Sequence, residues 1–188
     1  MRELGNFDQE SELEGTLLIA HPSLKDPNFH RSVIYLPAHD PEKGAMGLVI
    51  NRPSGRVAAD FLPNIELGIL GEIPVFLGGP VGLNHMTFTS LSCEANDPAL
   101  FFLTHLSLTE ASDLANNKEH QLRAYLGYAG WSGGQLEAEL SQKAWMVYAP
   151  TYEDLNFKDS KNIWAKLIGR FGPAYQLMAM APDDPSMN

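Results

Sequence analysis

The chain has 188 residues, a length that suits one domain able to fold without disulfides or metals. It carries 23 Asp and Glu against 13 Lys and Arg, and this net charge of −10 argues against coating a nucleic-acid backbone. The single cysteine, Cys93, excludes an intramolecular disulfide framework and a cysteine-rich zinc site. We expect a cytoplasmic protein, because the start has no apolar signal segment and the longest uncharged stretch, 73–93, is broken by proline and glycine.

In chain order, short strand-like runs come first and helical patterns follow. We predict strands at 15–20, 32–36 and 46–51, a turn at 52–55, a short helix at 57–62, strands at 75–77, 86–90 and 100–104, a helix at 109–117 capped by Thr109, a strand at 122–128, a helix at 135–143, a strand at 145–148 and a helix at 160–169. Consecutive early strands with later helices favour an α+β layer fold.

The acidic side chains are concentrated at the two ends of the chain. The first 14 residues hold five of them and the last six hold two, so residues 15–182 carry 16 acidic against 12 basic side chains. We therefore predict an acidic lead-in at 1–14, a single domain at 15–182 and a tail at 183–188. Within the domain, residues 31–56 are slightly basic, which is compatible with one small anionic ligand.

The segment at 130–134, Gly-Trp-Ser-Gly-Gly, has the G-x-S-x-G spacing of a nucleophile elbow. A hydrolase of that type needs a histidine after the serine, but the last histidine of the chain is His120. We therefore interpret Ser132 as a helix cap and the glycines as turn residues. Because N–H groups at a helix start attract anions, this turn also suits an anion site, with Gly78 and Gly79 as a second approach.

The remaining polar residues form no catalytic or metal-binding pattern. The six histidines lack the H-E-x-x-H spacing, and Glu137 and Glu139 are two apart, so on a helix they point to different sides. We predict no catalytic residue, no metal and no cofactor. Arg52 and Arg56 suit either a bound carboxylate or phosphate or a structural ion pair.

Four long strings resemble the YqgE/AlgH family of bacterial proteins. They are LEGTLLIAHPSLKDPNFHRSVIYLPAH at 13–39, GAMGLVINRP at 44–53, PVFLGGPV at 74–81 and LGYAGWSGGQLEAEL at 126–140. The resemblance implies a single-domain α+β fold with a mixed, largely antiparallel, bifurcated or pseudo-barrel sheet flanked by helices. It implies no established activity, although some members are described as transcriptional regulators. The family motif tolerates other residues at the position of Ser132, which argues further against a serine nucleophile.

Two function classes follow from these observations. The first is a non-enzymatic regulatory or binding protein that engages a protein partner or a small anionic ligand. Its candidate pocket consists of seven residues: Arg31, Arg52, Gly78, Gly79, Trp131, Gly134 and Gln135. The alternative is a small hydrolase or nucleotide-handling enzyme that uses the turn at 130–134 as an anion site. The acidic charge disfavours direct DNA binding, and the sequence leaves the oligomeric state open.

Overall fold

The computed structural model describes residues 13–94, 97–155, 160 and 162–181. In chain order the elements are β1 (Leu17–Ala20), β2 (Val33–Asp40), β3 (Gly44–Val49), β4 (Pro53–Val57), the 3-10 helices η1 (Ala58–Asp60) and η2 (Gly68–Glu72), β5 (Pro74–Leu77), β6 (Val81–Glu94), β7 (Asp97–Leu106), α1 (Leu108–Ala115), β8 (Gln121–Ser132), α2 (Gln135–Ser141), β9 (Trp145–Tyr148), α3 (Tyr152–Leu155), α4 (Ile163–Ile168), η4 (Gly169–Phe171) and α5 (Pro173–Met180). Most of the predicted lead-in at 1–14 and the predicted tail at 183–188 lie outside the described residues.

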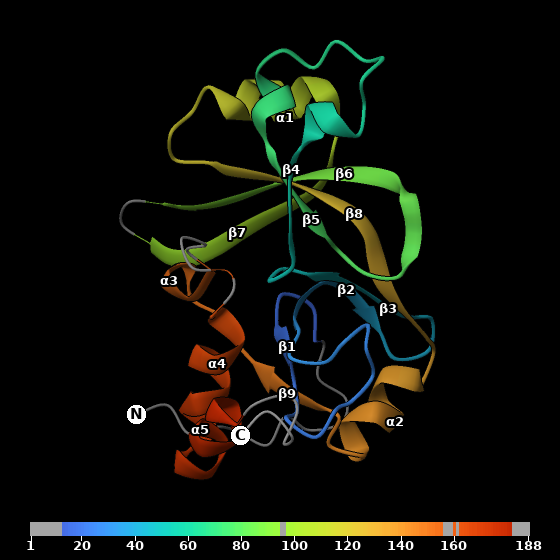
Figure 1. Cartoon of the computed structure of the whole chain (residues 1–188), viewed down its shortest axis with the longest axis vertical. Helices are drawn as coiled ribbons and strands as arrows, with labels where there is room; N and C mark the ends of the chain where they lie inside the picture. The colour runs from blue at the N-terminus through green and yellow to red at the C-terminus, as the bar shows by residue number, and fades with distance from the viewer. Residues whose placement is uncertain (1–12, 95–96, 156–159, 161, 182–188) are drawn as a thin grey trace.

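The described strands form one sheet that divides at β8. Its path is β4-β5-β8-β3-β2-β1-β9, and β6 joins β8 separately and carries β7. Residues 129–132 of β8 pair with β3, whereas residues 124–126 run parallel to β5. Every other pairing among the described strands is antiparallel. The predicted α+β domain with a mixed, largely antiparallel, bifurcated sheet is confirmed, and the sheet curls into a half-barrel (Figure 1).

Strand β8 separates two hydrophobic cores, because alternate side chains of a strand point to opposite faces. Tyr125 is fully buried in the larger core with residues of β1, β2, β3 and α4. Ala124 lies in the smaller core with Phe88, Leu70 and Ala111. Figure 1 shows α1 over this smaller core at the upper end, and α2, α4 and α5 at the lower end.

The predicted elements overlap the observed ones, but one helix start is wrong. Helix α1 begins at Leu108, and its N-cap is Ser107 rather than Thr109. The Ser107 hydroxyl oxygen accepts a hydrogen bond from the Glu110 N–H at 3.2 Å, and the Glu110 carboxylate accepts one from the Ser107 N–H at 2.9 Å. This reciprocal capping box was present in the sequence as Ser-x-x-Glu, and it outweighs a threonine two residues later.

Two further local predictions are corrected by the tertiary context. The predicted helix at 57–62 is reduced to the single 3-10 turn η1. The predicted turn at 52–55 is instead largely part of β4, which pairs with β5 alone among the described strands. Pro53 is tolerated there because β4 is an edge strand, so the N–H group that proline lacks breaks no hydrogen bond between strands. Helix α5 was not predicted, and it begins with Pro173, whose fixed φ suits the first helical position.

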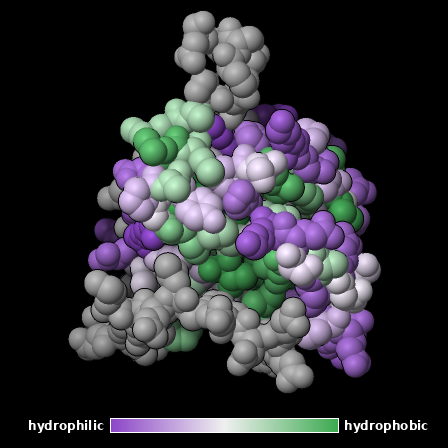
Figure 2. Space-filling model, turned by 90° about the horizontal axis from the view of Figure 1, so that it is seen from below, coloured by the Kyte–Doolittle hydropathy of each residue, from purple (hydrophilic) through white to green (hydrophobic). Residues whose placement is uncertain are grey.

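Helix α5 leaves Leu177, Met178 and Met180 exposed at the lower end of the molecule. Figure 2 views this end and shows apolar (green) residues gathered beside polar (purple) ones. In the described part of the chain, no helix is long and apolar enough to cross a membrane.

A polar cluster fastens the C-terminal helices to β9. The Asp154 side chain is buried, and its carboxylate accepts hydrogen bonds from Tyr148 Oη at 3.0 Å and from Thr151 Oγ1 at 2.9 Å. Arg170 Nη2 lies 2.7 Å from the other carboxylate oxygen. Burial alone would raise the pKa of Asp154, but the hydrogen bonds from Arg170, Thr151 and Tyr148 outweigh it and hold the pKa below its usual value.

We expect Asp154→Asn to lower the free energy of unfolding by about 2 kcal/mol at pH 7, because Arg170 loses its charged acceptor. The folded-state pKa of Asp154 is below the unfolded one, so this stabilisation is complete above about pH 4 and is lost as the pH falls through the folded pKa. Urea titrations at pH 7 and near pH 3 should therefore show a difference between parent and variant that shrinks in acid. Glu153→Gln is the control, since Glu153 is exposed and has no ion pair among the described residues. A difference of equal size at both pH values would contradict the prediction.

Candidate functional site

The Gly78-Gly79 motif lies between β5 and β6, where the connecting segment packs directly against the backbone of β8. The Gly78 N–H donates to Leu126 O and its carbonyl accepts from the Val49 N–H, both at 2.8 Å. A Cβ atom on Gly78 would lie 2.3 Å from Gly127 O, and one on Gly79 would lie 2.1 Å from the Tyr128 carbonyl carbon. These glycines therefore allow two backbone segments to touch.

The second motif forms the corner between β8 and α2. Trp131 is buried, stacks on Phe29 with ring centroids 6.4 Å apart, and donates its indole N–H to Glu139 at 2.9 Å. Gly134 has a φ of 74° and is the N-cap of α2, so the prediction that Ser132 caps this helix is wrong. The Gln135 side-chain oxygen closes the turn by accepting from the Ser132 N–H and hydroxyl, at 3.1 and 3.2 Å.

The two candidate arginines fasten the loop that precedes β2. Arg31 Nη2 donates to Ala181 O at 2.6 Å, and its guanidinium lies 5.0 Å from the Trp164 ring centre. Arg52 Nη2 donates to His30 O at 3.2 Å. Burial lowers the pKa of Arg52, although nearby Asp26 opposes this, and at neutral pH the group remains a cation.

The structure shows which of the seven predicted site residues have neighbours in common. Arg52 lies beside the Gly78 strand, because the Leu77 N–H donates to Arg52 O at 2.9 Å. Trp131, Gly134 and Gln135 share the corner of α2. Arg31 instead contacts the C-terminal helices. A common pocket for all seven residues stays a prediction.

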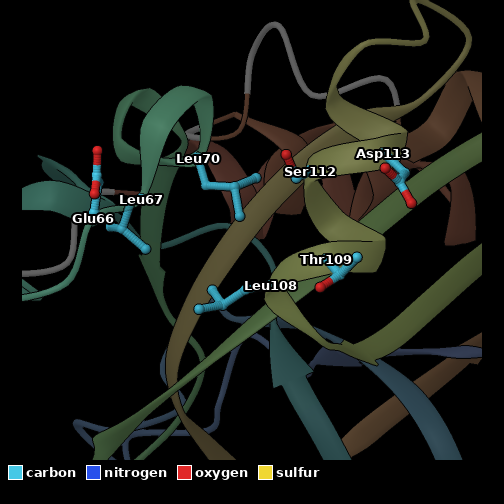
Figure 3. Close-up of a pocket in the computed structure, with 7 residues that line it drawn as sticks. All are labelled: Glu66, Leu67, Leu70, Leu108, Thr109, Ser112 and Asp113. Atoms are coloured by element: carbon cyan, nitrogen blue, oxygen red, sulfur yellow. The ribbon is translucent and has the colours of Figure 1, made fainter.

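A separate hollow, which sequence reasoning missed, lies between η2 and α1. It has a volume of about 300 Å³ and is lined by Glu66, Leu67, Leu70, Leu108, Thr109, Ser112 and Asp113. Figure 3 shows Leu67 and Leu70 on one wall and Leu108, Thr109, Ser112 and Asp113 on α1. The hollow therefore has leucine walls and two hydroxyls, with a carboxylate on each side.

Large apolar side chains are exposed on both segments that build this hollow. Leu108 is 44% exposed, and Ile65 and Ile69, on the segment that forms the opposite wall, are 46% and 47% exposed. Helix α1 packs on the smaller core through the fully buried Ala111 instead. Leu70, at 2% exposed, belongs to that core and gives the hollow a fixed floor. A rigid floor with exposed apolar edges is the form of a binding surface.

The buried charge of Arg123, away from this hollow, packs against an aromatic ring of the core. Arg123 on β8 is buried with its guanidinium 4.0 Å from the Phe76 ring centre, and burial lowers its pKa to about 10. It therefore stays protonated at neutral pH. Among the described residues, no group of three His, Cys, Asp or Glu side chains is arranged to hold a metal ion.

Comparison with known proteins identifies the family of the chain. A family model described as AlgH-like matches residues 17–176. The chain belongs to the AlgH-like family. This AlgH-like chain is 33% identical over 189 residues to a "UPF0301 protein" of Thermobifida fusca, covering 94% of this chain and 96% of the relative. It is 40% identical over 146 residues to one from Stutzerimonas stutzeri, covering 72% and 76%.

Solved structures support the same assignment. The solution structure of the AlgH protein from Pseudomonas aeruginosa superposes with a TM-score of 0.67 at 30% identity, covering 96% of this AlgH-like chain and 100% of that chain. A crystal structure of a protein from Corynebacterium diphtheriae has a TM-score of 0.74 at 19% identity, covering 93% and 95%, and shows the shared fold. The predicted family is confirmed, and the names of these relatives state no activity.

Proposed function

We propose that this AlgH-like chain is a non-enzymatic regulatory or binding protein of the bacterial cytoplasm and that it acts through a protein partner. The observation that carries the proposal is the hollow between η2 and α1, which the exposed Leu108 lines, with Ile65 and Ile69 also exposed on the segment opposite α1. Exposed apolar surface costs free energy in water, and a partner that covers it recovers that free energy. A small anionic ligand at the arginine and glycine motifs remains a second prediction.

The geometry of the turn at 130–134 supports a serine hydrolase less well than it supports a binding protein. A serine nucleophile needs a base within hydrogen-bonding reach of its hydroxyl. The Ser132 hydroxyl instead donates to the Gln135 amide oxygen, and no imidazole or carboxylate of the described residues is hydrogen-bonded to it. An amide oxygen cannot take up the proton, so we prefer a binding function.

We expect Leu108→Ala to reduce capture of the partner from a bacterial extract at least about fivefold, because the variant loses apolar contact area at the edge of the hollow. Leu177→Ala on α5 is the matched control, since Leu177 is even more exposed and lies at the other end of the molecule. Quantitative mass spectrometry of proteins bound to the immobilised full chain measures the effect. Equal losses for both variants would contradict a role for the hollow.

A screen of ester and phosphate substrates tests the enzymatic alternative directly. Turnover that disappears in Ser132→Ala would overturn the proposal of a non-enzymatic protein. Turnover that persists in this variant and co-purifies with the chain would also overturn the proposal, whereas turnover that is lost on further purification would indicate a contaminating enzyme.

A further inference from the structure

We infer that the hollow between η2 and α1 accepts a basic amphipathic helix of the partner protein. In this arrangement an apolar side chain of the helix enters the hollow between Leu67, Leu70 and Leu108, and lysine or arginine side chains reach Glu66 and Asp113. The inference rests on the proposed function and adds to it the chemistry of the partner.

The shape of the site supports an inserted side chain. Leu67 and Leu70 are held by the smaller core, so the floor is preformed, whereas Leu108 and Ile69 are exposed along the edge. Two walls from different segments, with leucines on both sides, make a short groove rather than a flat patch (Figure 3). Amphipathic helices bind such grooves by placing apolar residues at i, i+3, i+4 and i+7 along one face.

The net negative charge of residues 15–182 lies in the two segments that build the groove, and two of their acidic residues, Glu66 and Asp113, line it. The segments 58–72 and 107–119 carry six acidic side chains and one basic side chain, Lys118. The rest of residues 15–182 carries 10 acidic and 11 basic side chains. The negative balance of the domain therefore belongs to the two segments that build the hollow, and it favours a positively charged partner there.

The two carboxylates at the hollow are available for such a partner. Asp60 forms an ion pair with Arg56 at 3.6 Å, and Glu110 is held by the capping box with Ser107. Glu66 and Asp113, in contrast, have no ion pair or side-chain hydrogen bond within the described part of the chain. Both carboxylates line the hollow beside Leu67, Leu70 and Leu108, so a lysine or arginine on the partner can pair with them while its neighbours bury apolar surface.

The test uses the full chain and two synthetic helical peptides. Both peptides carry leucines at i, i+3, i+4 and i+7; one has lysines on its other face and its matched counterpart has glutamates. We expect the lysine peptide to bind in isothermal titration calorimetry and to bind about tenfold more weakly when the salt rises from about 0.05 to 0.5 M. We expect no binding of the glutamate peptide.

Variants locate the binding on the chain. The double change Glu66→Lys and Asp113→Lys should weaken binding of the lysine peptide by at least about tenfold and allow the glutamate peptide to bind. Glu153→Lys, an exposed acidic residue outside the groove, should leave both unchanged. Circular dichroism checks that each variant is folded.

Three outcomes would overturn the inference. The first is equal binding of the lysine and glutamate peptides, and the second is lysine-peptide binding that the double change does not weaken. The third is self-association of the chain in ultracentrifugation that the double change abolishes, because a second copy would then occupy the groove. If the lysine peptide fails while Leu108→Ala still reduces capture from extract, the basic partner is wrong and the proposed binding function stands.

Discussion

Replacing Gly79 by alanine is expected to lower the free energy of unfolding by about 3 kcal/mol or more, the cost of forcing extra volume into a packed site that cannot relax. The added Cβ atom would lie 2.1 Å from the Tyr128 carbonyl carbon and 2.3 Å from the Ala129 nitrogen. All its close neighbours are backbone atoms of β8, so no side chain can rotate away. Relief requires β8 to separate from the segment that connects β5 and β6.

Gly130→Ala on β8 is the matched control for this substitution. A Cβ atom at Gly130 would meet only the edge of the Tyr128 ring, at 3.3 Å, and that ring is on the surface and can move. We expect this variant to lose less than about 1 kcal/mol. Urea unfolding followed by tryptophan fluorescence measures both. Similar losses for the two variants would show that backbone contact at Gly79 is not what the motif preserves.

The contact of Gly78 and Gly79 with β8 also lies close to both hydrophobic cores. Strand β8 carries Tyr125 into the larger core and Ala124 into the smaller one, and the glycine contact is only a few residues further along the strand. The position of β8 therefore affects Leu70 at the floor of the hollow, through the smaller core, as well as the half-barrel sheet. Close backbone approach therefore accounts for the glycines of this motif.

Much of the fold could be predicted from the sequence because its strands are local patterns. The run at 32–36 is rich in β-branched and aromatic residues, the run at 122–128 carries two tyrosines, and both belong to strands in the structure. The edge strand β4 could not be predicted, because its proline and glycine indicate a turn and only pairing with β5 makes it a strand. The start of α1 was predictable in principle from its capping box.

The hollow between η2 and α1 could not be predicted from the sequence, for a physical reason. Unusual residues such as Gly79 and Trp131 attract functional interpretations, yet their geometry here is explained by close backbone approach and buried packing. The hollow is built from leucines and carboxylates about 40 residues apart in the chain, which have no distinctive local pattern. The signal is tertiary: Leu108 stays exposed in the first turn of α1, although Ala111, about one turn further along, is buried.

Glu139→Leu is expected to lower the free energy of unfolding by about 3 kcal/mol, because two buried donors lose their acceptor at once. Glu139 Oε2 accepts the indole N–H of Trp131 at 2.9 Å and that of Trp145 at 2.7 Å. Both indole rings are buried and pack edge to face with centroids 6.1 Å apart. Leucine has a similar size, so the loss reports the missing acceptor more than a cavity.

Glu139→Gln separates the hydrogen bonds from the charge. Its amide oxygen can still accept from Trp131 and Trp145, so we expect a loss of about 1 kcal/mol, since hydrogen bonds to a neutral acceptor are weaker. Urea unfolding followed by tryptophan fluorescence and near-ultraviolet circular dichroism measures both variants. If the leucine variant is as stable as the glutamine variant, the indole N–H groups do not depend on residue 139. Packing of the Trp131, Trp145 and Phe29 rings would then hold the corner between β8, α2 and β9 without these hydrogen bonds.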